Sequence, residues 1–581
     1  MPSKPYGTDP RDIYTLLDEK CGIKGHRREP RPKAEHRIAV KKVAIIGAGI
    51  SGLYTAMILQ SLDIPFKIIE ASNRTGGRIL THRFSNDPAQ YYDVGAMRFP
   101  LGLPLMSRLK KLFERADIAP HITLIPYKFH SDNNMHYLHY NGVLTRKMNL
   151  PIALGDHFGF GVPPAYHAAA TGYDRIVKDV RTPYVTALAN EMANGGHEGW
   201  DLLMTQDRFS TRAFMAVQAP GFMAVQPPGF PNHVINWCET MEGPTGDYDR
   251  AFSRTVLGAM AFGATDPPPV LPNWTCIDGG SSGIINAMLE ALHLPLNPPA
   301  DPPPPAHPLA HIVYNTPVTA IGLTPPVPGL PPVPATMTVG YYGGVFEPFS
   351  HVISTIPLPV LRTMDISKNN LTVDQRLALR QLRYGHSVKI GVQFRSRWWE
   401  NKFDNSDPPQ PVGIVGGQSS TDMPIRTVVY PSYGLDRLAT EPAVLIASYC
   451  RTEDAERLAA LIVQFNSTPL DPNPDINPLA FNPDEPLRNP LASLVLRNLA
   501  ELHKVDVDFL AMEVMAIHPW DWNAAPYAMG ASAFFGPSDY DELKHLREPA
   551  AGGRLHFAGD AISTRHASVS SHILVIKKCS L

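Results

Sequence analysis

The sequence predicts an α/β fold organised around a parallel β-sheet. Residues 43–46 form a short apolar run, and such runs are typical of buried parallel strands. Residues 51–62 predict a helix, and the apolar run at residues 66–69 predicts a second strand. A strand, a helix and a second strand in this order make the βαβ unit from which parallel sheets are built.

Three glycines in G-x-G-x-x-G spacing join the first strand to the helix. Gly47 allows a sharp turn, Gly49 lets a pyrophosphate approach bare backbone, and Gly52 lets helix and strand pack closely. Because the helix begins at Ser51, its amino end carries roughly +0.5 of a charge toward that pyrophosphate. Glu70 follows the second strand, where a carboxylate accepts hydrogen bonds from the ribose of an adenine dinucleotide. The stretch therefore predicts a dinucleotide site.

A second glycine pair with flanking arginines follows the acid, as Arg74, Gly76, Gly77 and Arg78. A nicotinamide enzyme does not need this second patch of bare backbone. With the first glycines it completes the pattern GxGxSGL…E-x-x-x-R-x-GGR, which resembles the flavin amine oxidases. The resemblance implies that these residues bind FAD in a Rossmann-type (GR2-like) domain.

Composition agrees with a large enzyme. Of 581 residues, 44% are hydrophobic, and the formal net charge of −2 indicates neither a nucleic-acid nor an anionic membrane partner. No window approaches 18 uninterrupted apolar residues, and the first 30 residues lack a signal-peptide apolar region, so we expect a cytoplasmic protein without a membrane segment. The five cysteines have neither metal-ligand nor disulfide spacing, which favours buried or free thiols.

Residues 91–100, YYDVGAMRFP, contain the next informative motif. Within the family this run resembles the G-A/P-M-R-hydrophobic-P segment of the L-amino acid oxidases. The resemblance implies that Gly95, Ala96 and Met97 approach the flavin, and that Arg98 lies beside it and holds the substrate carboxylate. A guanidinium suits this role because it binds a carboxylate through two parallel bonds and keeps its charge on burial. The alternative is a structural ion pair at Arg98.

Two residues of the second half are assigned to catalysis. Lys389 precedes Trp398-Trp399-Glu400 at the spacing of the family lysine that holds a water near the flavin N5. Tyr430 lies in RTVVYPS and matches, by resemblance, a tyrosine that joins the arginine on the substrate carboxylate. The alternatives are a solvated lysine and a tyrosine packed in a β-face.

Further cofactor contacts are implied by resemblance. Residues 311–321 predict a strand in which Val318 bonds the adenine through its backbone. Trp522 belongs to a W…PYA-x-G-A segment that faces the flavin, and Gly559 and Asp560 end an apolar strand whose acid binds the ribitol. Because that segment contains no cysteine, we expect non-covalent FAD.

The chain departs from the family after residue 567. Ser568 replaces an aromatic residue of the substrate cage, and the glycine-led helix that follows in the family is replaced by SSHILVIKK. Ser568 is still expected at the substrate and Val569, which matches the next family residue, at the cofactor. The change indicates either a wider cavity or a tail that is not genuine.

We expect three interleaved domains after an N-terminal arm at residues 1–40. The FAD-binding domain comprises residues 41–97, 273–360 and 550–581. A mixed β-sheet domain for the substrate comprises residues 98–144 and 361–549, and a helical domain comprises residues 145–272.

The resemblance implies FAD-dependent oxidation of an L-amino acid by dioxygen to a 2-oxo acid, ammonia and hydrogen peroxide. The alternatives are a monoamine or polyamine oxidase, an amide-forming amino acid monooxygenase, and an inactive flavin-binding homologue. Relatives are often dimers, so a homodimer is one expected state.

Overall fold

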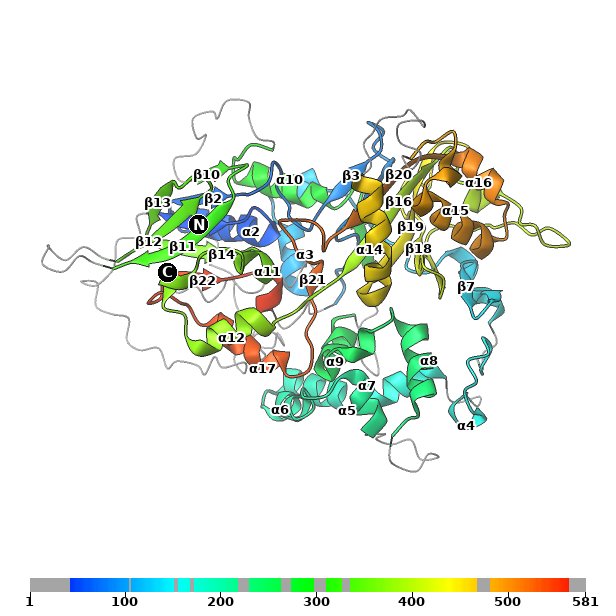
Figure 1. Ribbon diagram of the computed structural model, residues 1–581, viewed down its shortest axis with the longest axis horizontal. Helices are drawn as coiled ribbons and strands as arrows, with labels where there is room; N and C mark the ends of the chain where they lie inside the picture. Colours follow the sequence, from blue (N-terminus) through cyan, green and yellow to red (C-terminus); the bar gives the residue numbers. More distant parts are fainter. Residues whose placement is uncertain are drawn as a thin grey trace, which may run out of the picture.

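The computed structural model describes residues 42–103, 106–150, 155–167, 172–217, 229–262, 273–296, 310–325, 335–467 and 481–563. Figure 1 shows three groups of elements: a parallel sheet with its helices, a larger mixed sheet, and a cluster of helices. The predicted α/β fold is confirmed. The domain boundaries stay predictions, and residues 1–40 lie outside the described part of the chain.

The parallel sheet has the strand order β10-β2-β1-β14-β22. Its strands are β1 (Val43–Ile46), β2 (Phe66–Ile69), β10 (Ala310–Val313), β14 (His351–Ser354) and β22 (Leu555–Phe557). The predicted strand, helix and strand are confirmed as β1, α2 (Ile50–Ser61) and β2. Apolar side chains of β1, α2, α3 (Ser107–Phe113) and α10 (Ser282–Ala291) share one core on this side of the sheet.

The strand predicted over residues 311–321 is two strands, so that prediction is wrong. The chain bends between them at Asn315, whose φ is 50°, and Pro317 directly precedes the second strand. The second strand, β11 (Val318–Thr324), leaves the parallel sheet and joins β12 (Thr336–Tyr341) and β13 (Phe346–Phe349) in an antiparallel sheet.

The mixed sheet has the strand order β20-β16-β19-β18-β17-β7-β8. Its strands are β7 (Tyr137–Tyr140), β8 (Val143–Arg146), β16 (Ser387–Phe394), β17 (Gln418–Thr421), β18 (Thr427–Val429), β19 (Ala443–Arg451) and β20 (Val514–Asp521). One face packs in a shared core with α14 (Thr452–Ser467), α15 (Pro490–His503) and α16 (Val507–Glu513).

The side chains of strand β16 lie alternately on the helix-covered face and on the opposite face of this sheet. Val388, Ile390 and Val392 enter the helix-covered core. Lys389 and Gly391 therefore face the opposite way, toward the strand β4 (Tyr91–Asp93). A Cβ atom on Gly391 would lie 2.4 Å from the Tyr92 ring, so this glycine lets the two segments approach closely.

The third group consists of helices around α5 (Tyr173–Asn194), which packs against α6, α8 and α9. Its other members are α4 (Pro164–His167), α6 (Glu198–Met204), α7 (Thr211–Val217), α8 (Asn232–Glu242) and α9 (Phe252–Ala261). They lie together below the two larger sheets in Figure 1.

Short elements connect these groups. The strands are β3 (Thr81–Arg83), β5 (Phe99–Pro100), β6 (Leu124–Pro126), β9 (Trp274–Ile277), β15 (Tyr384–Gly385) and β21 (Ser532–Ala533). The helices are α11 (Leu358–Leu361), α12 (Val373–Gln381), α13 (Trp398–Asn401) and α17 (Asp539–Arg547). Short 3-10 turns are η3 (Ala119–His121), η4 (Asp132–Asn134), η5 (Lys147–Asn149), η6 (Asp247–Asp249), η7 (Ser367–Asn369), η8 (Pro486–Arg488) and η9 (Asp560–Ile562).

Two predictions concern the state of the cysteines and the presence of a membrane segment. Cys238, Cys276 and Cys450 are buried and free, as expected; the other two cysteines lie outside the described residues. Among the helices that the structure describes, none is both long enough and apolar enough to cross a membrane.

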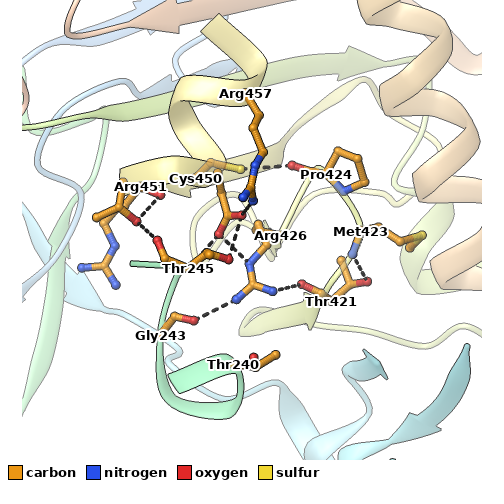
Figure 2. A network of polar contacts seen from close by, with 12 residues as sticks. Thr240, Gly243, Thr245, Thr421, Met423, Pro424, Arg426, Cys450, Arg451 and Arg457 are labelled. Atoms are coloured by element: carbon orange, nitrogen blue, oxygen red, sulfur yellow. Dashed lines mark hydrogen bonds and ion pairs between the residues drawn. The ribbon is translucent and has the colours of Figure 1, made fainter. Parts of the chain in front are cut away.

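A buried polar network joins the helical group to the mixed sheet (Figure 2). Arg426 pairs through Nε with Asp454 Oδ2 at 3.1 Å and donates from Nη2 to the Gly243 carbonyl at 2.8 Å, just after α8. Asp454 also accepts from the backbone N–H and hydroxyl of Thr245, each at 3.0 Å, and from Arg457 at 2.9 Å. The Asp454 and Arg426 side chains are only 7% and 10% exposed. If one of the two is removed, water therefore cannot solvate the charge of the other.

We therefore expect Asp454→Ala to lower the free energy of unfolding by about 3–5 kcal/mol, because it leaves the Arg426 guanidinium buried without a counter-ion. Thermal and denaturant unfolding of the purified protein measure this. The matched control is Asp541→Ala, which breaks an exposed pair with Lys544 and should change stability little. Equal effects of the two substitutions would contradict the proposed role of the network.

Candidate active site

The glycine turn between β1 and α2 has the close packing that its spacing predicts. Gly47 has φ +100°, and a Cβ atom on Gly52 would lie 2.0 Å from the Gly47 carbonyl oxygen. Glu70 accepts the N–H of Ala48 at 2.7 Å and the N–H and hydroxyl of Ser72 at 2.9 and 2.7 Å. These bonds hold the carboxylate beside the turn, with lone pairs left for a ligand hydroxyl.

The second glycine pair lies directly against the first. Gly76 forms a parallel bridge with Gly49, so two stretches of backbone without side chains adjoin each other. Arg74 donates to the carbonyls of Thr75 and Gly77; burial lowers its pKa, and the nearby Glu70 charge opposes this. Arg78 donates to Ala531 O at 3.1 Å and to Asp560 Oδ2 at 3.2 Å.

A cavity of about 330 Å³ begins at this turn. It continues along the carboxyl ends of β1, β2 and β14 to β16 and β19 of the mixed sheet. The expected site residues that line it are Gly47, Gly49, Ser51, Glu70, Arg74, Gly76, Gly77, Arg78, Gly95, Ala96, Val318, Lys389 and Trp522. Gly52, Met97, Arg98, Tyr430, Gly559 and Asp560 are not part of the wall, and Ser568 and Val569 lie outside the described residues.

The residues of this cavity fit a flavin adenine dinucleotide. The glycine backbones and the amino end of α2 suit a pyrophosphate, and the Glu70 carboxylate suits a ribose. Gly95 brings bare backbone to the wall; a Cβ atom there would lie 1.8 Å from the Arg78 carbonyl oxygen. Trp520 lines the same region, and its buried indole N–H has no hydrogen-bond partner among the described residues. A bound group with a polar edge would satisfy that donor.

Lys389 is a fully enclosed ammonium group in the cavity wall. Its Nζ donates to the carbonyl oxygens of Asp93 at 2.8 Å and Gly95 at 2.6 Å. Burial lowers the pKa of Lys389 to about 7; the Asp93 charge opposes the shift and the Arg98 charge adds to it. The lysine therefore changes charge near neutral pH, in contact with the backbone that lines the cavity.

Arg98 lies close enough to Lys389 for its charge to lower the pKa of that lysine, and it is not among the residues that line the cavity. Its Nη1 donates to the Tyr127 hydroxyl at 3.2 Å and to Gln418 Oε1 at 3.3 Å. The guanidinium carbon lies 4.4, 5.4 and 5.5 Å from the ring centres of Phe129, Tyr127 and Trp274. No ion pair between Arg98 and a carboxylate occurs within the described ranges, so the structural ion pair considered for this arginine is not found there.

Tyr430 does not line this cavity; it lines a small second cavity together with Met97 and Tyr127. Its hydroxyl is bonded to Ser419 Oγ at 2.8 Å and to His503 Nε2 at 2.6 Å in the helix-covered core. Burial lowers the pKa of His503 to about 4, so the pair is uncharged at neutral pH. The physical reason is alternation: Val429 faces the cavity side, and the next residue therefore faces the opposite side.

Tyr449 is the tyrosine that this face of the sheet presents. It pairs with Lys389 across β19 and β16, and it lines the cavity. The Lys389 Nζ lies 4.9 Å from the centre of the Tyr449 ring. Gln418 pairs with Val429 and reaches Arg98 from the same face. Sequence reasoning missed both residues. Alternation from Val444 and Ile446 predicts the core face for Tyr449, and an irregularity in the pairing of β16 with β19 at Ile390 and Gly391 reverses this.

The other expected cofactor residues have structural partners. The Trp522 indole N–H donates to the Val94 carbonyl at 3.2 Å. Met97 lines a second, small cavity beside Arg98. Asp560 is buried, pairs with Arg78, and begins η9 directly after Gly559.

Comparisons with known proteins agree with this geometry. The family model of the flavin-containing amine oxidoreductases matches residues 50–215 and 239–465. The chain is 41% identical to L-amino-acid oxidase 4 of Hebeloma cylindrosporum, over 98% of this chain and 86% of that protein. It is 25% identical to an L-amino-acid oxidase of Siganus canaliculatus, over 91% and 82% of the two chains.

Among solved structures, cyclohexylamine oxidase from Brevibacterium oxydans superposes with a TM-score of 0.58 at 15% identity, over 93% of this chain and 98% of that one. This likeness shows the fold. The predicted flavin-dependent oxidoreductase class is confirmed, and the chain belongs to the flavin-containing amine oxidoreductase family.

Proposed function

We propose that the protein oxidises L-amino acids with non-covalently bound FAD. The net reaction consumes an L-amino acid, dioxygen and water, and releases a 2-oxo acid, ammonia and hydrogen peroxide. The observation that carries the proposal is the charge of Arg98, which is partly buried among aromatic rings and meets no carboxylate of the described chain.

The surroundings of Arg98 favour a carboxylate ligand. A partly buried cation without a counter-ion costs free energy, and a substrate carboxylate supplies the missing charge through two parallel hydrogen bonds. Tyr127 and Gln418 hold the guanidinium in place, and the three rings exclude water on its faces. A simple amine has no group for this arginine.

Tyr449 and Lys389 complete the anchor from the mixed sheet. The Tyr449 hydroxyl is the second carboxylate donor, in place of the role expected for Tyr430. Lys389, bonded to the Asp93 and Gly95 carbonyls, holds a proton or a water beside the backbone of Gly95. Together they orient the substrate so that its Cα–H faces the cavity segment that Gly95 and Trp522 form.

FAD would be held by Glu70, the glycine backbones of the turn, Arg78 and Trp520. The chemistry that a bound flavin supplies is acceptance of a hydride and its transfer to dioxygen. Loss of a hydride from Cα and of a proton from the amine leaves an imino acid. Water converts this imino acid to the 2-oxo acid and ammonia. The described wall of the cavity contains no cysteine that could attach the cofactor covalently.

We expect Arg98→Ala to lower kcat/KM for L-amino acids roughly 10³- to 10⁴-fold, because the substrate loses its bidentate partner. A peroxide assay measures this, and the visible flavin spectrum checks that cofactor is retained. The matched control is Arg115→Ala, which removes a partly exposed arginine paired with Asp117 outside the cavity wall and should leave kcat/KM unchanged. If primary amines are substrates of the wild-type protein and Arg98→Ala leaves kcat/KM unchanged, the protein is an amine oxidase instead.

The two tyrosines make a matched pair of variants. Tyr449→Phe should lower kcat/KM roughly 10- to 100-fold, because one hydrogen bond to the charged substrate is lost. Tyr430→Phe should keep kcat/KM within about threefold and instead lower stability by about 1–3 kcal/mol, because Ser419 and His503 lose their buried partner. The reverse outcome would return the substrate role to Tyr430.

Lys389 predicts a pH dependence of stability. The unfolded lysine keeps its proton to about pH 10.4, whereas the folded one loses it near pH 7, so stability rises with pH between these values. We expect the stability of the wild-type protein relative to Lys389→Met to rise by about 2–3 kcal/mol from pH 7 to pH 9.5. Denaturant unfolding at both pH values tests this, and a difference that is independent of pH would place the pKa near its ordinary value.

A further inference from the structure

The cavity extends beyond the proposed carboxylate anchor along strand β19. Tyr449 and Arg451 are two residues apart on this strand and pair with Lys389 and Ser387 of β16. They therefore lie on one face of the sheet, about 6.6 Å apart along the strand, and both line the cavity. Arg451 is placed where the side chain of an anchored substrate would extend.

Arg451 has a half-buried charge without a counter-ion. No hydrogen bond or ion pair joins its guanidinium to the described residues, and in Figure 2 its side chain extends away from the guanidinium groups of Arg426 and Arg457. The carboxylate of this network, Asp454, accepts from Arg426, Arg457 and Thr245, and among the described residues no hydrogen bond or ion pair joins it to Arg451. The Arg451 side chain is not part of that network, and Arg451 lines the cavity.

The surroundings of Arg451 carry further positive charge. Arg254 of α9 lies over Phe534, 3.9 Å from the ring centre, and Phe534 lines the same cavity. The pKa of Arg254 is lowered by burial, raised by Asp247, and lowered again by the charge of Arg451. Asp247 is committed to Arg254 at 2.9 Å, so it does not neutralise Arg451.

A second polar group lines the same cavity from β21, which pairs with β15, the short strand before β16. Ser532 pairs with Gly385 just before β16, and both line the cavity. The Ser532 hydroxyl makes no hydrogen bond within the described part of the chain. Arg451 of β19 and Ser532 of β21 thus offer one charged and one neutral donor from strands that pair with the consecutive strands β16 and β15.

We infer that Arg451 and Ser532 form the subsite for the substrate side chain, and that it selects an L-amino acid whose side chain ends in a carboxylate, of the length of glutamate. This inference rests on the proposed function and adds the substrate class. A guanidinium and a hydroxyl donor satisfy a carboxylate, whereas an aliphatic side chain leaves the cation unpaired in a partly dry site. The short distance between Tyr449 and Arg451 suits the two carboxylates of one small dicarboxylate.

The test compares kcat/KM for L-glutamate, L-glutamine, L-leucine and L-methionine in the peroxide assay. We expect the wild-type enzyme to favour L-glutamate over L-glutamine at least tenfold. Arg451→Leu should lower kcat/KM for L-glutamate about 10- to 100-fold and change that for L-leucine less than threefold. Arg451→Lys, which keeps the charge and loses the bidentate geometry, should fall between them.

Arg457→Leu is the matched control, because it removes the same charge from an exposed residue of α14 that does not line the cavity. It should leave the ratio of L-glutamate to L-leucine unchanged. A ratio that Arg451→Leu does not alter, or equal use of glutamate and glutamine by the wild-type enzyme, overturns the inference while the oxidase proposal stands. Failure to oxidise any amino acid overturns both.

A binding measurement on the wild-type protein tests the subsite without depending on the folding of any variant. Glutarate should perturb the flavin spectrum of the wild-type protein at concentrations at least tenfold lower than butyrate does, because only glutarate has a second carboxylate for Arg451. Equal concentrations for the two acids would contradict the subsite.

Discussion

The buried ammonium group of Lys389 is the contact on which the rest of the site depends. Its bonds to the carbonyls of Asp93 and Gly95 join the mixed sheet to the segment that follows β4, almost 300 residues earlier in the chain. Two glycines allow this approach: Gly391 leaves room for the Tyr92 ring, and Gly95 leaves room for the Arg78 backbone. Asp93 is fixed in turn by Thr81 and Ser281, at 2.6 to 2.9 Å.

This junction explains why the site lies between the sheets. The dinucleotide turn is built within β1, α2 and β2, but the reacting end needs residues of β16 and β19. Because alternation sends Val388 and Ile390 into the helix-covered core, the residue between them must face the dinucleotide part. Burial of that core therefore determines the direction of the lysine, and the lysine brings the two parts together.

Sequence reasoning succeeded where the signal is local. The strand, the glycine spacing and Glu70 are separated by few residues, and each has a conformational reason that does not depend on distant contacts. It was less successful where the face of a strand decides. The residues of RTVVYPS read as a strand, but only pairing with β17 and β19 shows that Val429 faces the cavity side and Tyr430 the core. A register difference of one residue exchanges the two faces, and no local pattern records it.

The same limit applies to the split of residues 311–321. Its apolar residues are compatible with a strand in either sheet, and the bend at Asn315 divides them between the parallel and the antiparallel sheet. Chain turns of this kind depend on where the next segment finds a partner, which β12 supplies from the antiparallel sheet.

The distribution of charge gives the site its chemical character. Arg98 and Arg451 both lack a carboxylate partner within the described chain, while Arg426, Arg457 and Arg254 have one. An amino acid that binds near such cations meets favourable sites for its carboxylates and an unfavourable one for its ammonium group. Positive surroundings lower the pKa of an amine, so the same charges that hold the substrate favour the neutral amine from which a hydride can leave. Binding and activation of the substrate thus follow from one electrostatic arrangement.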